Sequence, residues 1–239
     1  YNISKTKMLE ATTKYNSGNF SDASNLVFNG NSTIENLQHS NTLFDQKISY
    51  TNKFKDKKVF LLTGRFIDEK VPQNYSINQF LYEDLFPGFD NANSVKQKTA
   101  NRMQFAGFNA HVLNRMENGH LLELQMGNEY RKDNLTTAFS LLENQTVLGK
   151  PNNYQNQSTY QVNDLYFKSK YRYKISDLGI VGKLDFHQIF NRLENNSVSE
   201  NSNPFFINPS IGIEWEINDK NKITSTYSYN TSNARVLDV

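Results

Sequence analysis

The stretch GHLLELQMGNEYR, residues 119–131, alternates apolar and polar side chains at almost every position. One set of alternate positions holds His120, Leu122, Leu124, Met126 and Tyr130, and the other holds Glu123, Gln125, Glu129 and Arg131. Successive side chains of a strand point to opposite faces of a sheet, whereas a helix would scatter the glutamates around its circumference. The alternation therefore predicts a β-strand with one apolar face and one polar face.

The same period of two residues recurs along the chain. It is clear in residues 42–54, 164–175, 178–190 and 206–217, and weaker in residues 5–15, 58–67, 102–114 and 222–230. We therefore expect about nine strands. Each is near the 9–11 residues that a tilted strand needs to cross a bilayer.

The predicted connections alternate in length. Short polar turns are expected at residues 55–57, 117–119, 176–177 and 218–220, and long loops rich in Asn, Ser and Gln at residues 16–41, 68–100, 132–160 and 191–204. This alternation places every long loop at the same end of the strands. Outer-membrane barrels have short periplasmic turns and long extracellular loops, so we predict that the long loops are extracellular.

The composition agrees with a barrel and excludes other classes. The 239 residues are 37% hydrophobic and 21% charged, with a mean hydropathy of −0.69. A barrel strand shows apolar side chains to lipid only at every second position, so its average stays polar. No apolar run approaches the length of a membrane-spanning helix. A net charge of +2 gives no reason to expect a nucleic-acid partner, and the lack of cysteine excludes disulfides and thiolate metal sites.

Aromatic residues on the predicted apolar faces gather in two rows. With the long loops outside, the outer row holds Tyr15, Phe44, Phe66, Tyr130, Phe190 and Tyr229, and the row near the short turns holds Phe54, Phe60, Tyr173 and Trp215. Two belts of aromatic rings are expected where lipid headgroups meet hydrocarbon. The alternative is that these rings form the core of a soluble β-sandwich.

Charged residues dominate the opposite faces. The predicted lumen-facing residues are Glu123, Glu129, Lys168, Lys170, Arg172, Lys183, Asp185, Glu214 and Glu216. Unpaired charges in a dry interior cost too much, so we expect water or a polar plug domain inside a wide barrel.

The expected number of strands indicates whether this chain could close a barrel by itself. Nine strands would bring the first and the last together in parallel, whereas bacterial single-chain barrels are even-numbered and antiparallel. The chain also begins and stops abruptly. We therefore expect residues 1–239 to be a fragment of one outer-membrane barrel domain, with the closing strands missing.

Two stretches carry a family resemblance. DQKISYTNKFKDKK (residues 45–58) and NPSIGIEWEINDKNKITSTYSYN (residues 208–230), followed by TSNARVLD (residues 231–238), resemble the barrel region of TonB-dependent outer-membrane receptors. The resemblance implies a 22-stranded barrel in a Gram-negative outer membrane. It also implies an N-terminal plug domain, which is not present in this chain, and energy delivered by the TonB complex. Expected partners are outer-membrane lipid, the plug and the TonB complex; a surface lipoprotein or subunits of an envelope complex are further candidates.

The sequence offers little that points to catalysis. The four histidines lack metal-ligand spacing. Asp185 with His187 could form a dyad, and Glu214 with Glu216 could form a glycosidase pair. Both pairs also fit the repeated alternation of ordinary wall residues. We therefore predict no enzymatic activity, no cofactor and no metal site.

The strongest charge feature is the run Lys168, Lys170, Arg172 and Lys174. On a lumen wall it would favour anionic solutes or pair with acidic residues of the plug. The alternative is a solvated face compensated by nearby glutamates.

Three functions fit the sequence. The first is solute uptake through the barrel. The second is a receptor-like barrel that acts as a structural scaffold or as a subunit of an envelope complex. The third is a soluble carbohydrate-binding β-sandwich, which would need a dry core between two sheets.

Overall fold

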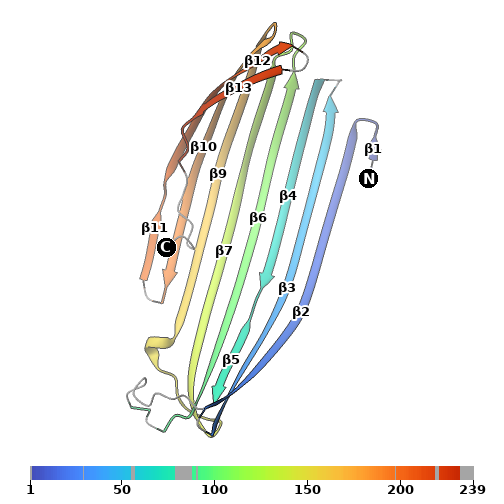
Figure 1. Cartoon of the computed structure of the whole chain (residues 1–239). Helices are drawn as coiled ribbons and strands as arrows, with labels where there is room; N and C mark the ends of the chain where they lie inside the picture. Colours follow the sequence, from blue (N-terminus) through green and yellow to red (C-terminus); the bar gives the residue numbers. More distant parts are fainter. Residues whose placement is uncertain are drawn as a thin grey trace.

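The computed structural model describes residues 2–28, 30–54, 57–78, 88–89, 91–196, 198–218 and 221–231. Their strands form one 13-stranded sheet, in which β1-β2-β3-β4-β6-β7-β9-β10-β12-β13 is the order of neighbours. Figure 1 shows a single curved layer, with β2 near one edge and β13 at the other. The predicted all-β, antiparallel architecture is confirmed.

The long strands are β2 (Lys7–Phe28), β3 (Asn31–Phe54), β4 (Lys58–Lys70), β6 (Ser94–Arg115), β7 (Leu121–Glu143), β9 (Asn156–Ile175), β10 (Leu178–Asn195), β12 (Phe205–Asn218) and β13 (Asn221–Ser228). The short elements are β1 (Asn2–Ser4), β5 (Gln73–Asn78), β8 (Thr146–Gly149), β11 (Val198–Ser202) and the 3-10 turn η3 (Asn152–Tyr154). Each long strand pairs antiparallel with the next along the chain, so each of the nine predicted strands is present.

The predicted long loops are wrong in one respect, because most of their residues are strand. β2 continues to Phe28 and β3 begins at Asn31, so residues 16–28 and 31–41 form two paired strands. The other three segments likewise continue the strands on either side. Asn, Ser and Thr side chains do not interrupt a ladder whose hydrogen bonds run between backbones. The polar composition therefore does not mark an end of the strands.

Parts of several predictions lie outside the described residues. These are residue 29 of the first predicted loop, 79–87 and 90 of the second, 197 of the fourth, 55, 56, 219 and 220 of two short turns, and 232–238 of the family-like stretch.

Two prolines divide ribbons that otherwise continue. β4 is followed by β5 after Pro72, and β11 is followed by β12 after Pro204. Proline has no N–H to give to the ladder, but its carbonyl still accepts. The N–H of Ser40 donates to the Pro72 oxygen at 3.1 Å, and the N–H of Ile189 donates to the Pro204 oxygen at 3.0 Å.

The sheet has almost no buried core. Among the described residues the buried apolar side chains are Val95, Leu141, Leu142, Tyr166, Val181 and Ile189, and most large apolar side chains are exposed. A sandwich would cover one face of each sheet with the other. The β-sandwich alternative is therefore wrong. No helix in the described part of the chain has the length and apolar character needed to cross a membrane.

The register separates the two faces of the sheet. Directly opposite residues of an antiparallel pair share a face, so a face can be followed from strand to strand. Tyr15 lies opposite Phe44, for example, and Met126 lies opposite Phe167. Followed in this way, nine of the ten predicted belt residues share one face, which we call the apolar face; Tyr229 lies just beyond the end of β13, outside the ladder. All nine predicted lumen residues share the other, which we call the polar face. That the apolar face meets lipid stays a prediction.

The extended pairing of β2 with β3 can be tested by cross-linking, because the chain contains no cysteine. Ser21 lies opposite Gln38, whereas Asn36 lies opposite Ala23. We expect the variant Ser21→Cys/Gln38→Cys to form a disulfide on mild oxidation, since opposite Cα atoms in a ladder lie within disulfide reach. Ser21→Cys/Asn36→Cys, one diagonal step away, should form much less. Peptide mass mapping reads both, and equal yields would contradict the register.

Candidate functional site

The polar face carries an ion network close to the turns β9–β10 and β12–β13. Its members are Glu123, Lys170, Arg172, Lys174, Glu214, Glu216 and Lys222. Arg172 Nη2 lies 2.8 Å from Glu214 Oε2 and 3.7 Å from Glu216 Oε1. Three lysines of β9 and β13 form further ion pairs with these glutamates. The distance from the lysine Nζ to the nearest carboxylate oxygen is 3.3 Å for Lys170 and Glu123, 3.4 Å for Lys174 and Glu216, and 3.0 Å for Lys222 and Glu214.

This network decides between two interpretations of the basic run on β9. Three of its four cations, Lys170, Arg172 and Lys174, are paired with glutamates of neighbouring strands. For these three residues the second interpretation holds: their charges are compensated by nearby glutamates. Glu214 and Glu216 share Arg172 and each contacts a lysine, so cations hold both carboxylates in place.

Tyr166 occupies the middle of the polar face and is 6% exposed. Its ring lies across Gly127 of the neighbouring strand β7, where a Cβ would meet the ring Cζ and hydroxyl at 2.6 Å. The amide of Asn109, on β6, donates to the Tyr166 hydroxyl at 3.2 Å. Gly127 therefore lets one aromatic side chain cross a whole strand and tie three strands together.

His187 is held beside Tyr166. Its Nδ1 lies 2.9 Å and 3.0 Å from the two carboxylate oxygens of Asp164, and its ring stacks on Tyr166 with centroids 5.7 Å apart. The hypothetical Asp185–His187 dyad is wrong, because Asp185 lies opposite Lys168 and His187 pairs across the strands with Asp164. Asp164 and Tyr166 were missed as candidates, because only the register brings them to His187.

Four predicted lumen residues lie outside the network, namely Glu129, Lys168, Lys183 and Asp185. Among the described residues none of them has an ion pair within 4.0 Å. Lys168 Nζ instead sits 5.0 Å from the centroid of the Tyr166 ring. The middle of the polar face therefore presents charges of both signs around the buried Tyr166 ring.

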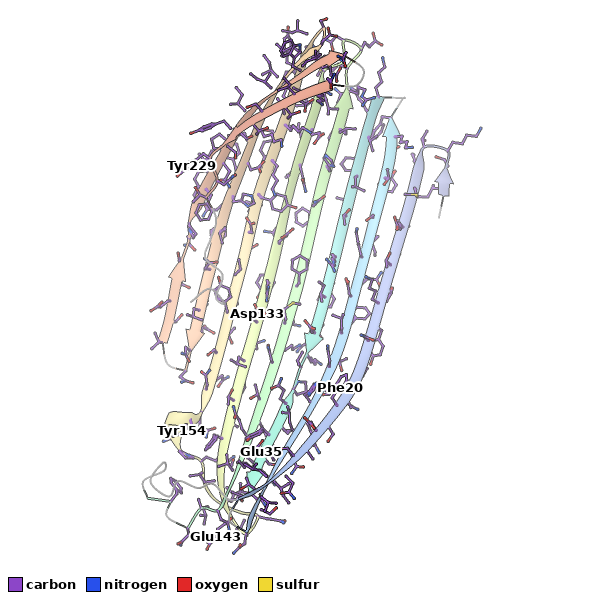
Figure 2. All side chains as sticks on the ribbon, viewed as in Figure 1. Phe20, Glu35, Asp133, Glu143, Tyr154 and Tyr229 are labelled. Carbon is purple, nitrogen blue, oxygen red and sulfur yellow. The ribbon has the colours of Figure 1, made fainter. Side chains whose placement is uncertain are left out.

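Polar and aromatic side chains, with carboxylates such as Glu35 among them, line the polar face at the end remote from the short turns, which we call the far end. A hollow of about 330 Å³ there is lined by Leu37, Gln73, Tyr75, Gln97 and Thr99. Burial, followed by the nearby Glu35 carboxylate, raises the pKa of Tyr75 above 10.0, so its hydroxyl stays a donor at neutral pH. Phe20 stacks on His39 with ring centroids 4.8 Å apart. Figure 2 shows Phe20 and Glu35 at this far end.

The far-end surface can bind through hydrogen bonds and ring stacking. Within the described part of the chain, no group of three or more His, Asp or Glu side chains could hold a metal ion.

The comparisons with known proteins bear on the fold. No family model and no curated protein matches the sequence. Among solved structures, the chain is similar to the ferric citrate transporter FecA, with a TM-score of 0.52 and 9% identity over 90% of this chain and 36% of FecA. It is also similar to the siderophore receptor PiuA from Acinetobacter baumannii, with a TM-score of 0.53 and 9% identity over 94% of this chain and 42% of PiuA. The chain therefore spans about two fifths of the length of these neighbours.

The close contact of Tyr166 with Gly127 predicts an asymmetric response to larger side chains. Gly127→Val should lower the free energy of unfolding by about 1–3 kcal/mol, because Tyr166 must leave its place or the strands must separate. Gly64→Val is the matched control, since no heavy atom lies within 4 Å of its Cβ position. Urea unfolding of the parent protein measures both. Equal stability of the two variants would show that Tyr166 does not depend on Gly127.

Proposed function

We propose that this chain, which has the fold of the barrel of TonB-dependent outer-membrane receptors, forms part of the wall of a barrel that takes up a solute across the outer membrane. The apolar face would contact lipid and the polar face would line the lumen. The far end would be extracellular.

A charge-free band on the apolar face carries this proposal. Between the two aromatic belts, none of the described strands has an Asp, Glu, Lys or Arg on this face. Charges begin again just beyond the outer belt, at Asp68, Arg102, Lys132 and Arg192. On β4 the band runs between Lys58 and Asp68, which corresponds to about 25 Å along the normal for a strand tilted by about 40°. That height matches the apolar band of outer-membrane barrels.

The edges of the sheet support a larger barrel. Among the described residues, β2 has no partner strand on its outer edge from Glu10 onward, and β13 has none on its outer edge. An unpaired backbone group in hydrocarbon costs several kcal/mol, so further strands must cover both edges in a membrane. β2 and β13 run parallel, and antiparallel closure therefore needs an odd number of additional strands.

The polar face supports transport. Its middle and far end combine mixed charges, hydrogen-bonding side chains and exposed rings, which are suited to a hydrated solute pathway. Such a wall also suits contact with a polar plug domain in the parent protein. Energy from the TonB complex would then move the plug. In the alternative role, as a scaffold for an envelope complex, the lumen beside the polar face would be occupied permanently and no solute would pass.

Growth separates uptake from scaffolding. Deletion of the gene for the parent protein should abolish growth on one limiting nutrient, and removal of TonB should reproduce that defect. Measured accumulation of the radiolabelled nutrient is the direct readout. A scaffold predicts general envelope fragility without a nutrient-specific loss, and that outcome would overturn the uptake proposal.

The assignment of the apolar face to lipid is tested by moving one arginine between faces. Leu62 is 43% exposed on the apolar face of β4, and its neighbour Thr63 points to the polar face. Leu62→Arg should destabilise the parent barrel in phospholipid vesicles by about 2–4 kcal/mol, because it places a charge near the bilayer midplane. Thr63→Arg, which lies opposite Ser49 and Asn109, should cost far less. Similar urea unfolding midpoints for both variants would contradict the assignment.

A further inference from the structure

Four basic residues gather on the apolar face just beyond the outer belt, on three neighbouring strands. We call Lys70, Lys98, Arg102 and Lys132, from β4, β6 and β7, the basic patch. Lys70 lies directly opposite Arg102, and Lys132 lies one diagonal step from it, since Arg102 is opposite Asn134. Side chains in these positions are within reach of one another.

The basic patch has a large excess of positive charge. Arg102 is bound by Asp68 through two contacts of 2.7 Å and 3.0 Å. Lys70, Lys98 and Lys132 have no ion pair within 4.0 Å among the described residues. Asp68 also lies near Lys70 and offsets one of the four positive charges, so the basic patch keeps a net positive charge that an external anion would neutralise.

The surrounding sheet does not share this charge. At the same height and on the same face, the described parts of β2, β3 and β9 carry only uncharged side chains. On β10 the corresponding cation, Arg192, is paired with Glu194. The excess is therefore local and does not encircle the sheet.

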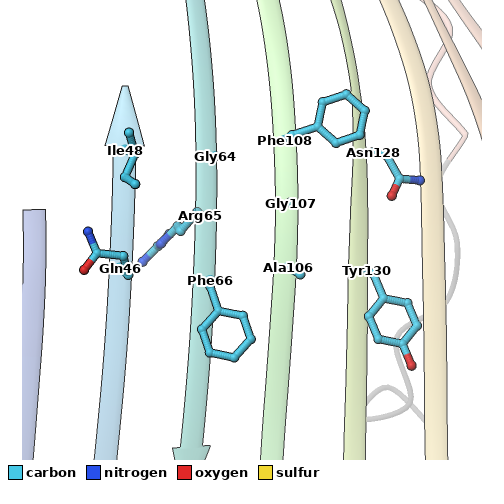
Figure 3. A pocket seen from close by; sticks show the side chains of 10 residues that line it. All are labelled: Gln46, Ile48, Gly64, Arg65, Phe66, Ala106, Gly107, Phe108, Asn128 and Tyr130. Carbon is cyan, nitrogen blue, oxygen red and sulfur yellow. The ribbon is translucent and has the colours of Figure 1, made fainter. Parts of the chain in front are cut away.

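A hollow in the apolar face lies directly beside the basic patch, on the bilayer side. It measures about 420 Å³, and its lining includes Ile48, Gly64, Phe66, Ala106, Phe108 and Tyr130. Figure 3 shows Phe66, Phe108 and Tyr130 around the small residues of β4 and β6. The hollow exists because Gly64 and Ala106 fill little space between these rings.

We propose that the basic patch and the hollow together bind one lipid whose headgroup carries a phosphate. The phosphate would contact Lys70, Arg102 and Lys132, and an acyl chain would lie in the hollow. The proposal rests on the proposed function, because it requires the apolar face to meet lipid. The position of the two features supports it: Tyr130 of the hollow and Lys132 of the patch are two residues apart on the same face of β7.

A lipid explains more than a free anion does. A soluble phosphate would satisfy the cations but would have no use for an apolar hollow on the bilayer side of them. In a lipid the charged headgroup is followed by an acyl chain. On the sheet the basic patch is followed, toward the bilayer, by the apolar hollow, so the two orders match. Each basic residue near an anionic headgroup raises the affinity about fivefold, so a group of three gives a selective site.

The test uses the full-length parent protein, delipidated in detergent, with phosphatidylglycerol and phosphatidylcholine of identical acyl chains as probes. Native mass spectrometry measures the fraction with bound lipid. Lys70→Gln/Lys132→Gln should lower affinity for phosphatidylglycerol by about 30-fold, and leave the weak binding of phosphatidylcholine unchanged. Lys7→Gln/Lys58→Gln, which removes two charges from the apolar face at the opposite end of the band, should keep wild-type affinity.

A second variant tests the hollow. Gly64→Leu places a side chain in the hollow from a position where no heavy atom lies within 4 Å of the new Cβ, and should weaken phosphatidylglycerol binding while the protein stays folded. Unchanged binding in this variant, or displacement of the lipid by millimolar inorganic phosphate, would reduce the site to an anion site and overturn the proposal. Equal losses in both lysine pairs would also overturn it. Failure of the proposed function appears separately, as a parent protein that stays monodisperse in water without detergent.

Discussion

The hydrogen-bonded ladder between neighbouring strands is the constraint on which the rest of this molecule depends. The sheet is a single layer, and the described residues bury few side chains between elements. Pairing therefore holds the chain in shape where a globular domain would rely on a packed core. Because side chains alternate strictly, the register of that pairing also decides which residues share a face. A slip of one residue in any strand would move its charges onto the apolar face.

The two ends of the sheet differ for a physical reason. Near the short turns the strands end close to the aromatic residues Phe54 and Trp215. At the far end they continue well past Phe44 and Tyr130 as polar ribbons. Backbone pairing does not require apolar surroundings, so Asn- and Ser-rich hairpins can extend the ladder. The extended ribbons carry the stacked Phe20–His39 pair and the hollow around Tyr75 away from the band.

The charged side chains of the polar face are arranged in two different ways. Near the short turns, arginine and lysine side chains are paired with glutamates across strands, which neutralises the wall. In the middle, Tyr166 lies across Gly127 and beside the Asp164–His187 pair, while Lys168 and Asp185 have no ion-pair partner among the described residues. A charge-compensated part of the polar face and a mixed-charge part thus lie along the same strands.

The sequence by itself determined the strands and their two faces, since the alternation in residues 119–131 already separates Glu123 and Glu129 from Leu122 and Tyr130. It could not determine how far each strand runs, because Asn and Ser residues occur both in loops and in the solvent-exposed parts of strands. β2, for example, continues through such residues to Phe28. The sequence also could not determine which residues are neighbours across strands. His187 meets Asp164, and Tyr166 crosses Gly127, only because the register sets these strands side by side. Spacing along one strand is local chemistry, whereas partners across strands follow from pairing, which the tertiary structure alone decided.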